Sequence, residues 1–166
     1  MFEIEEIIDA NTKSDICNNI LRSLPGWFGV EQSIADYVAQ VRSLPFYASY
    51  DQENDLPVGF AAVKPHSPYA AEICVMGVLE EYHRKGIGKM LTSSCEDYCR
   101  KSKMEFLTVK TLDESREDEG YRNTRMFYTG IGFRPIEVFP MLWDEDNPCL
   151  LMAKYISQKK GRGLFR

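Results

Sequence analysis

Hydrophobic and polar positions along the chain follow two distinct periods, and each period predicts a different kind of element. Residues 2–8 alternate between apolar and acidic side chains, which is typical of a strand with one buried face. Residues 33–44 have apolar side chains three or four positions apart, the spacing of an amphipathic helix. Residues 72–79 are mostly apolar, which favours a strand in the centre of a sheet.

Over the whole chain these patterns predict strands and helices in the order β-α-α-β-β-β-α-β-α-β-β. The predicted helices run from a cap at Asn11 or Thr12 to residue 24, over 33–44, from a turn at 83–88 to residue 103, and over 121–131. The remaining strands cover 46–50, 58–64, 106–111, 133–139 and 150–156. We expect an α/β or α+β fold with a mixed sheet, formed by one domain over residues 1–156. A basic tail, residues 157–166, is expected to fray.

The composition fits one cytoplasmic domain. Of the 166 residues, 44% are apolar and 27% are charged, an ordinary balance for a globular protein. The acidic N-terminus does not resemble a signal peptide, and no apolar stretch is long enough to cross a bilayer. We therefore expect a cytoplasmic location and no membrane partner. The five cysteines are odd in number and form no CxxC pair, which argues against a disulfide framework and against a metal site.

Charge is unevenly distributed along the chain. The net charge of −5 argues against a nucleic-acid partner, which would require a basic face. Residues 1–60 contain ten acids and three bases, which gives −7, so the remaining residues carry +2. Either this asymmetry is only a solvated surface, or the acidic part attracts a cationic substrate while the other part meets an anionic cofactor.

A glycine-containing turn between the strand at 72–79 and the following helix has the features of a diphosphate site. Gly86 and Gly88 leave the backbone accessible, and the helix start exposes free N–H groups at the positive end of the helix dipole. A P-loop would require GxxxxGK[ST] and a dinucleotide fold would require GxGxxG, and the turn matches neither. A plain structural turn is the remaining alternative. The candidate anion-binding residues are His83, Arg84, Lys85, Gly86, Ile87, Gly88 and Lys89.

The end of this turn, Gly86-Ile87-Gly88, resembles the [Q/R]-x-x-G-x-[G/A] signature of the GCN5-related N-acetyltransferase (GNAT) superfamily, with His83 in its first position. Further along, Phe127-Tyr128-x-x-x-Gly132-Phe133 is similar to the family's FYxxxGF element. The resemblance covers roughly residues 58–156. It implies a GNAT-type, mostly antiparallel sheet of about six to seven strands flanked by helices.

The resemblance also implies a cofactor site without a metal. Acetyl-coenzyme A would lie along a strand that separates from its neighbour, and Met76, Gly77 and Val78 occupy that stretch. The family often has a cofactor-contacting Asn seven residues before the Tyr of its FYxxxGF element. Asn123 lies two positions out of step with that place and is the nearest candidate.

Two residues have the chemistry of a general base and a general acid. Glu72 begins the central strand, eleven residues before His83, a spacing similar to that of the glutamate base in histone-acetylating members. A base is required because an alkylamine attacks a thioester only when it is neutral. Tyr128 matches a family position whose Tyr commonly protonates the departing coenzyme A thiolate. The alternatives are a surface acid or ion pair for Glu72 and a packing role for Tyr128.

These observations predict an acetyl-coenzyme A-dependent N-acetyltransferase that acts by direct attack of an amine, for which we expect a small cationic molecule. Residues 24–29 lie where the superfamily commonly walls the acceptor site, and Trp27 and Phe28 would suit an aromatic or aliphatic acceptor. Cys74 has no recognisable His partner, which argues against a covalent cysteine intermediate. A protein or peptide N-acetyltransferase and a non-catalytic acetyl-coenzyme A-binding sensor or interaction module stay open, as does a homodimer, since dimers are common among relatives.

Overall fold

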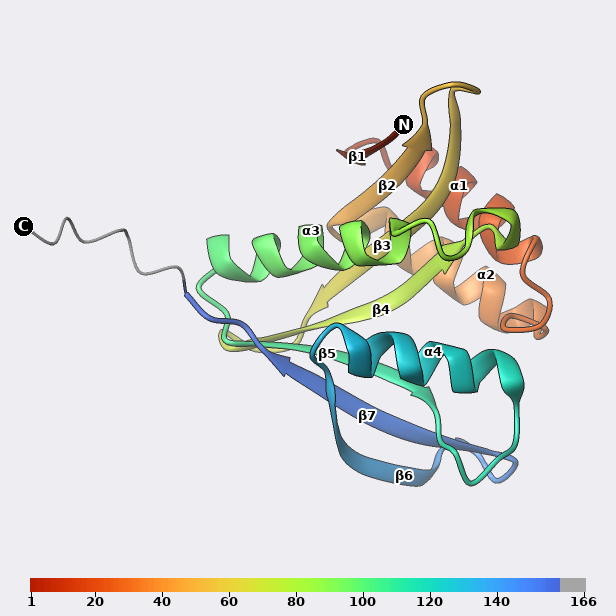
Figure 1. The fold of residues 1–166 in the computed structure, drawn as a ribbon, viewed down its shortest axis with the longest axis vertical. Helices are drawn as coiled ribbons and strands as arrows, with labels where there is room; N and C mark the ends of the chain where they lie inside the picture. Colours follow the sequence, from red (N-terminus) through yellow and green to blue (C-terminus); the bar gives the residue numbers. More distant parts are fainter. Residues whose placement is uncertain (159–166) are drawn as a thin grey trace, which may run out of the picture.

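The computed structural model describes residues 1–158, which form one sheet and the helices that cover it (Figure 1). The predicted basic tail lies, from residue 159 onward, outside the described residues. The strands are β1 (Phe2–Glu6), β2 (Phe46–Asp51), β3 (Leu56–Pro65), β4 (Ala70–Val78), β5 (Phe106–Leu112), β6 (Arg134–Asp144) and β7 (Asn147–Tyr155). The α-helices are α1 (Ala10–Arg22), α2 (Glu31–Gln40), α3 (Ile87–Lys101) and α4 (Glu119–Gly130). Short 3-10 turns cover Val41–Ser43 and Glu80–Tyr82.

The strands form a seven-stranded sheet in the order β1-β2-β3-β4-β5-β7-β6. Every pair of neighbours is antiparallel except β4 and β5, which are parallel. This arrangement confirms the expected mixed, mostly antiparallel sheet and the predicted order of elements. The parallel pair is required because α3 connects β4 to β5 and returns the chain to the same end of the sheet.

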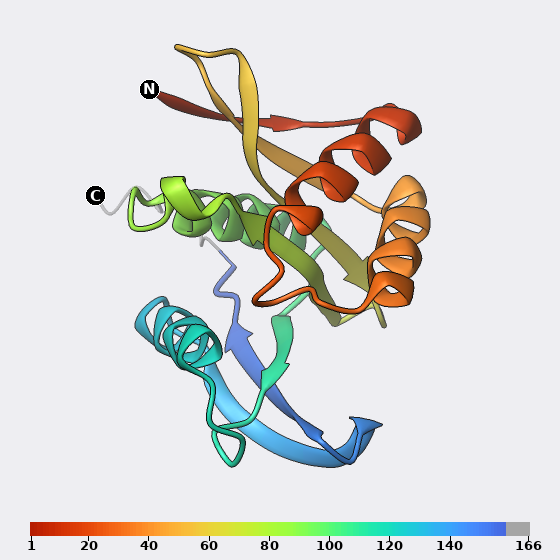
Figure 2. The same ribbon diagram turned by 90° about the vertical axis from the view of Figure 1, so that its right-hand side faces the viewer.

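Helices cover both faces of the sheet, and each face has its own apolar core. Helix α1 buries Ile16, Ile20 and Leu21 against β2, β3 and β4 on one face, where α2 packs beside it. Helices α3 and α4 lie on the other face, and Figure 2 shows them across the sheet from α2. In α3, Leu91 and Cys95 recur at helical spacing and are fully buried. The sheet is therefore enclosed on both faces over β3 and β4, the strands that carry the site.

Three predicted boundaries were wrong, each for a local reason. The first helix is capped by Asp9 rather than by Asn11 or Thr12, because the Asp9 carboxylate accepts a hydrogen bond of 2.8 Å from the Thr12 amide. The second helix extends only to Gln40 and tightens into a 3-10 turn. The last helix starts two residues before its predicted position, because the Asp118 carboxylate accepts a hydrogen bond of 3.0 Å from the Tyr121 amide.

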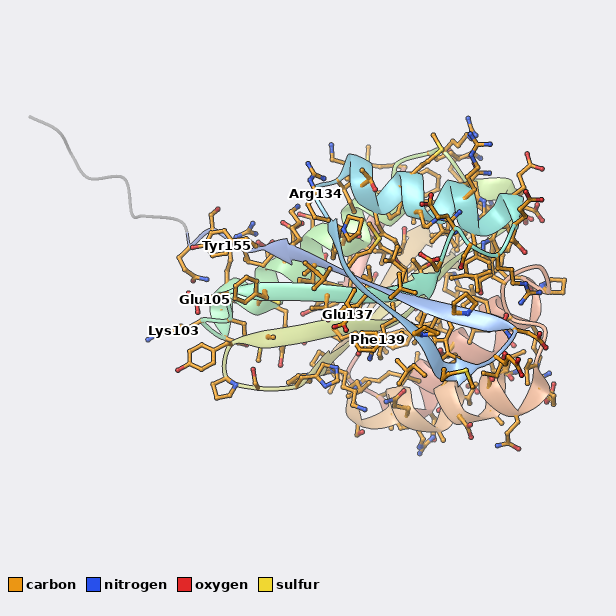
Figure 3. The ribbon with its side chains drawn as sticks, turned by 90° about the horizontal axis from the view of Figure 1, so that it is seen from below. Lys103, Glu105, Arg134, Glu137, Phe139 and Tyr155 are labelled. Atoms are coloured by element: carbon orange, nitrogen blue, oxygen red, sulfur yellow. The ribbon has the colours of Figure 1, made fainter. Side chains whose placement is uncertain are left out.

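Strand β6 forms one edge of the sheet and is longer than predicted. Figure 3 shows Arg134, Glu137 and Phe139 following this edge. The pairing with β7 shifts between Phe139, opposite Cys149, and Asp144, opposite Asn147. Four residues of β6, 140–143, therefore lie opposite a single residue of β7, and the bulge carries exposed apolar side chains.

No helix within residues 1–158 combines the length and the apolar character that crossing a membrane would require.

Candidate active site

The two parallel strands at the centre of the sheet separate, and a cavity fills the gap. Strand β4 pairs with β5 only from Ala70, opposite Phe106, to Glu72, opposite Thr108. Beyond this point β4 stays paired with β3 as far as Val78 but leaves β5. The separation implied by the family resemblance is therefore present. A cavity of about 910 Å³ lies here, and its lining comes from β4, β5, α4, the turn before α3 and the α1–α2 connection.

The turn before α3 presents free amide groups to this cavity. Gly86 directly precedes the first residue of α3 and adopts a left-handed conformation with φ of 82°. Arg84, two residues earlier, also has a positive φ, of 61°. Within residues 1–158, the backbone amides from 84 to 89 have no hydrogen-bond acceptor. Arg84 and Lys89 line the cavity. An anion at this helix start would meet both backbone N–H groups and cationic side chains.

Two residues of the turn have other contacts. The Lys85 ammonium lies 4.7 Å from the centre of the Tyr82 ring, and Lys85 is not among the cavity-lining residues. The His83 ring nitrogen Nε2 lies 2.7 Å from the Val78 carbonyl oxygen, at the end of the unpaired part of β4. The His83 ring also meets the Trp27 ring edge to face, at 5.7 Å. His83 therefore connects the turn to β4 and to the α1–α2 connection.

Two glycines of the site are explained by protein packing. A Cβ on Gly77 would lie 3.1 Å from a methyl group of Ile20, so this glycine lets α1 lie close to β4. A Cβ on Gly88 would lie 3.0 Å from the Phe127 ring. From the sequence we expected the bare backbone at Gly88 to let a ligand approach, whereas in the structure the Phe127 ring on α4 fills that space. Gly86 differs, because nothing lies within 4 Å of its Cβ position.

Tyr128 lines the cavity from α4 and is 7% exposed. Its ring packs between Phe127 and Phe133, with centroids 5.2 and 5.3 Å away. Burial raises the pKa of the Tyr128 phenol well above its ordinary value. No partner for its hydroxyl is found in the described part of the chain. The side chain therefore combines a packing role with a protonated hydroxyl at the cavity.

Glu72 lies at the point where β4 and β5 part. Its Oε1 atom accepts from the Lys110 ammonium at 3.0 Å and lies 2.7 Å from the His66 ring nitrogen Nε2. The Glu72 side chain is 9% exposed, whereas Lys110 is 32% exposed and is the partner that lines the cavity. Glu72 Oε2 has no hydrogen-bond partner within residues 1–158. Lys110 thus separates the Glu72 carboxylate from the cavity, and one carboxylate oxygen, Oε2, is left without a hydrogen-bond partner among residues 1–158.

Aromatic side chains form the cavity wall on the face that carries α1 and α2. Trp27 and Phe28, which the sequence suggested as an acceptor wall, line the cavity together with Tyr37. The Tyr121 hydroxyl donates to the Trp27 carbonyl at 2.9 Å, which connects the α1–α2 connection to α4. Trp143 adds a ring from the bulge of β6.

Several lining residues were not predicted from the sequence to belong to a site. They are Tyr37, Lys110, Thr111, Tyr121 and Trp143. Thr111 is 2% exposed, and its hydroxyl has no hydrogen-bond partner within residues 1–158. The signal that could have found Lys110 is its charge, because every other residue of this strand is uncharged.

The other residues that the sequence predicted to bind the cofactor also line the cavity. Met76, Gly77, Val78 and Ile87 line it beside the turn, and Asn123 lines it from an exposed position on α4. None of the ten acids in residues 1–60 lines the cavity, so their charge gives no support to a cationic acceptor. Among the described residues, His, Cys, Asp and Glu side chains form no group that could hold a metal ion.

The cysteine near the gap lacks the chemistry of a nucleophile. Burial raises the pKa of the Cys74 thiol to about 12, and the neighbouring Glu72 carboxylate acts in the same direction. The Cys74 thiol is 3.5 Å from the Ala62 carbonyl oxygen. A thiol in this state is protonated at neutral pH, which disfavours a covalent acetyl-cysteine intermediate.

Comparisons with known proteins agree with this geometry. A sequence model described as the acetyltransferase (GNAT) family matches residues 15–133. No curated protein matches the chain. An aminoglycoside 6'-N-acetyltransferase solved with coenzyme A is 21% identical, with a TM-score of 0.75 over 96% of this chain and 99% of that one. The aminoglycoside 6'-N-acetyltransferase from Enterococcus faecium is 22% identical, with a TM-score of 0.73 over 96% and 99%.

A protein-modifying enzyme is similarly close in structure. The ribosomal-protein-S18-alanine N-acetyltransferase from Escherichia coli is 17% identical and aligns over 100% of both chains, with a TM-score of 0.71. Identities this low establish a common fold and do not select one acceptor. Together with the family match, which spans most of the sequence, they show that the chain belongs to the acetyltransferase (GNAT) family.

Proposed function

We propose that this protein transfers the acetyl group of acetyl-coenzyme A to the amine of a small molecule. The observation that carries the proposal is the gap between β4 and β5, which lies directly beside the free amides of residues 84–89. A strand that leaves its neighbour offers unpaired backbone groups to an extended ligand. A helix start with free N–H groups offers a site for a diphosphate. Coenzyme A contains both kinds of group in one molecule.

In the proposed complex, the diphosphate would meet the amides of residues 84–89 with the Arg84 and Lys89 side chains nearby. The pantetheine arm would lie along β4 at Met76, Gly77 and Val78, with its amides in hydrogen-bond reach of the strand. The Val78 carbonyl already has the His83 ring as a partner, so the hydrogen bonds proposed for the arm fall on the backbone of Met76 and Gly77 rather than on this carbonyl. Asn123 lines the cavity from an exposed position, so the surrounding protein constrains its side chain little.

The chemistry would take place in the gap between β4 and β5, which is open to both faces of the sheet. The amine nitrogen attacks the acetyl carbonyl carbon, a C–N bond forms, and the C–S bond breaks as the thiolate leaves. One proton leaves the amine nitrogen, and one proton is required by the thiolate. We propose Glu72 Oε2 as the base, acting through water, because this oxygen is free and lies where the gap begins. Tyr128 is the proposed acid for the thiolate.

Calorimetry and a thiol-release assay test the proposal together. Purified protein should bind coenzyme A with measurable heat and should release free thiol from acetyl-coenzyme A when a suitable amine is supplied. Glu72→Gln should lower kcat/KM, since the amide cannot accept the proton that leaves the amine. The amine panel should cover polyamines, aminoglycosides, amino acids and arylalkylamines, with peptides carrying a free N-terminus or lysine as a separate arm.

Each outcome of this experiment discriminates between alternatives. Absence of heat with coenzyme A would reject the cofactor site and with it the proposed function. Binding without turnover on any amine or peptide would favour a sensor or interaction module. Thiol release with peptides but not with small amines would reassign the protein as a protein N-acetyltransferase.

A further inference from the structure

Aromatic rings line one end of the cavity and contact one another. On the face that carries α1 and α2, the Phe28 and Tyr37 rings meet edge to face at 6.1 Å. Burial raises the pKa of Tyr37 to about 12, and Cys74, Tyr121 and Glu72 lie near enough to act in the same direction. Tyr37 and Tyr121 are therefore uncharged at neutral pH. This end of the cavity suits a flat apolar body.

The Lys110 ammonium lines the same cavity as these rings. Lys110 lies on β5, and its Nζ is 3.0 Å from Glu72, one of the groups near Tyr37. Residues alternate between the two faces of a strand, so Lys110 and the next residue, Thr111, line the cavity from opposite faces. Thr111 shares a strand face with Val109, which packs with Tyr128, so Lys110 is on the opposite face, the one that carries α1 and α2.

The charge of Lys110 is only partly compensated by the protein. An ammonium has three N–H donors, and Lys110 uses one of them on Glu72 within residues 1–158. The same Glu72 oxygen also meets His66, so its negative charge is shared between two groups. The two acids that line the cavity lie elsewhere: Glu80 in the turn after β4 and Glu119, exposed, at the start of α4.

We propose that Lys110 binds an acidic group of the acceptor, so that the substrate is an arylalkylamine that also carries a carboxylate. This inference rests on the proposed function and names its substrate class. Glu72 holds the Lys110 ammonium at the point where the strands part, and the rings contact the aromatic body. A carboxylate accepts readily from an ammonium that has free donors in a partly buried site. A purely cationic acceptor would be repelled by the same group.

The test compares matched acceptors and matched lysine variants. Phenylalanine and 2-phenylethylamine differ by one carboxylate, and 3-phenylpropionate retains the carboxylate without an amine. Lys110→Gln removes the charge in the cavity. Lys64→Gln is the control, because Lys64 lies opposite Glu72 on the neighbouring strand β3 and does not line the cavity.

For the full-length protein with acetyl-coenzyme A, we expect Lys110→Gln to raise KM for phenylalanine about ten- to a hundredfold. The same variant should change KM for 2-phenylethylamine by less than about twofold, and Lys64→Gln should change neither value. By calorimetry, 3-phenylpropionate should bind the wild-type protein and the Lys64→Gln variant, and Lys110→Gln should weaken that binding to the same degree.

Two results would overturn the inference. One is an equal effect of Lys110→Gln on the acceptors with and without the carboxylate. The other is the absence of 3-phenylpropionate binding to the wild-type protein. Failure of the proposed function gives a different pattern: 3-phenylpropionate would still bind in a Lys110-dependent manner, while no amine would release thiol.

Discussion

Two hydroxyl groups belong to residues that line the cavity. Thr111 and Tyr128 both line the cavity and are buried, and neither hydroxyl has a partner within residues 1–158. For Thr111, whose hydroxyl is shut off from solvent, the missing partner costs about 1–3 kcal/mol. A bound ligand that accepts a hydrogen bond would remove this cost. The raised pKa of Tyr128 keeps its phenol protonated, which is the state that a proton donor requires.

Replacing Tyr128 by Phe removes the hydroxyl and leaves the ring between its aromatic neighbours. We expect kcat to fall about a hundredfold and the dissociation constant of coenzyme A to change less than about twofold. A thiol-release assay measures kcat, and calorimetry measures the dissociation constant of coenzyme A. Tyr98→Phe is the matched control, because Tyr98 packs against the same core from α3 and does not line the cavity. An unchanged kcat in Tyr128→Phe would exclude the hydroxyl from the mechanism.

At the scale of single residues, the sequence located side chains with distinctive spacing and missed those defined by contacts. Glu72 and Tyr128 were predicted because each keeps a fixed distance from a glycine motif. Tyr37 had the spacing of a buried helical residue, and only the tertiary fold brings it near Glu72. Lys110 required knowledge of the neighbouring strand, because its significance lies in the contact between β4 and β5.

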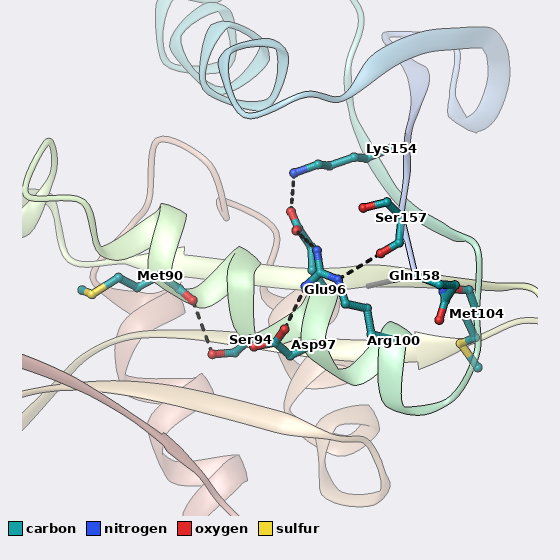
Figure 4. Close-up of polar contacts among 9 residues, drawn as sticks. All are labelled: Met90, Ser94, Glu96, Asp97, Arg100, Met104, Lys154, Ser157 and Gln158. Carbon is teal, nitrogen blue, oxygen red and sulfur yellow. Dashed lines mark hydrogen bonds and ion pairs between the residues drawn. The ribbon is translucent and has the colours of Figure 1, made fainter. Parts of the chain in front are cut away.

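At the scale of elements, a network of ion pairs connects the last strand, β7, to α3, the helix that follows the glycine-containing turn (Figure 4). The Glu96 carboxylate on α3 accepts from the Lys154 ammonium on β7 and, at 3.1 Å, from the Arg100 guanidinium. Arg100 also donates to the Ser157 carbonyl at 3.3 Å and to Asp97 at 2.8 Å. Since β7 pairs with β5, the network fixes the position of β5 relative to α3.

Glu96→Gln should destabilise the protein by about 2 kcal/mol, because two cations would then face a neutral amide in a partly buried position. Urea unfolding followed by circular dichroism measures this difference. Asp97→Asn is the control: Asp97 pairs with the same Arg100 but is 53% exposed, so its loss should cost less than about 0.5 kcal/mol. Equal losses in the two variants would contradict a role for burial.

The order and type of the elements followed from local patterns, and their ends depended on caps and pairing. The sequence predicted every strand because apolar runs between turn residues are a strong signal. It did not predict the extension of β6 to Asp144, since residues 140–143 are apolar yet exposed and bulged. That bulge brings Trp143 to the cavity, so a local irregularity forms part of the site.

At the scale of the whole molecule, the gap between β4 and β5 makes the cavity a passage between the two faces of the sheet. The cavity lining includes side chains that pack with the α1 core, such as Trp27, and side chains that pack with the α3 core, such as Phe127. In the proposed complex, coenzyme A and the acceptor would approach from opposite faces and meet in the gap. No local pattern encodes this property, because it arises from where β4 and β5 stop pairing.

The buried thiols should make the whole molecule sensitive to alkaline pH. Burial raises the pKa of Cys17 and Cys74 to about 12, and of Cys99 and Cys149 to about 11, against about 8.5 for a thiol in the unfolded chain. Above about pH 8.5 the unfolded chain loses these protons and the folded protein keeps them, so a rise in pH favours unfolding. The contribution of these thiols to the free energy of unfolding is fully present below the pKa of a thiol in the unfolded chain. It is lost as the pH rises toward the pKa values of the thiols in the folded protein. Each thiol contributes up to about 1.4 kcal/mol per pH unit in that window.

Urea unfolding under reducing conditions, from about pH 7 to about pH 10.5, measures the resulting slope. Cys17→Ala separates titration from packing. The variant should be less stable than the wild type at neutral pH because it leaves a cavity in the α1 core. Its stability should nevertheless fall less steeply with pH, since one fewer proton is lost on unfolding. A free energy of unfolding that stayed constant up to about pH 10 would show that the folded thiols ionise as readily as unfolded ones, and the argument from their burial would fail.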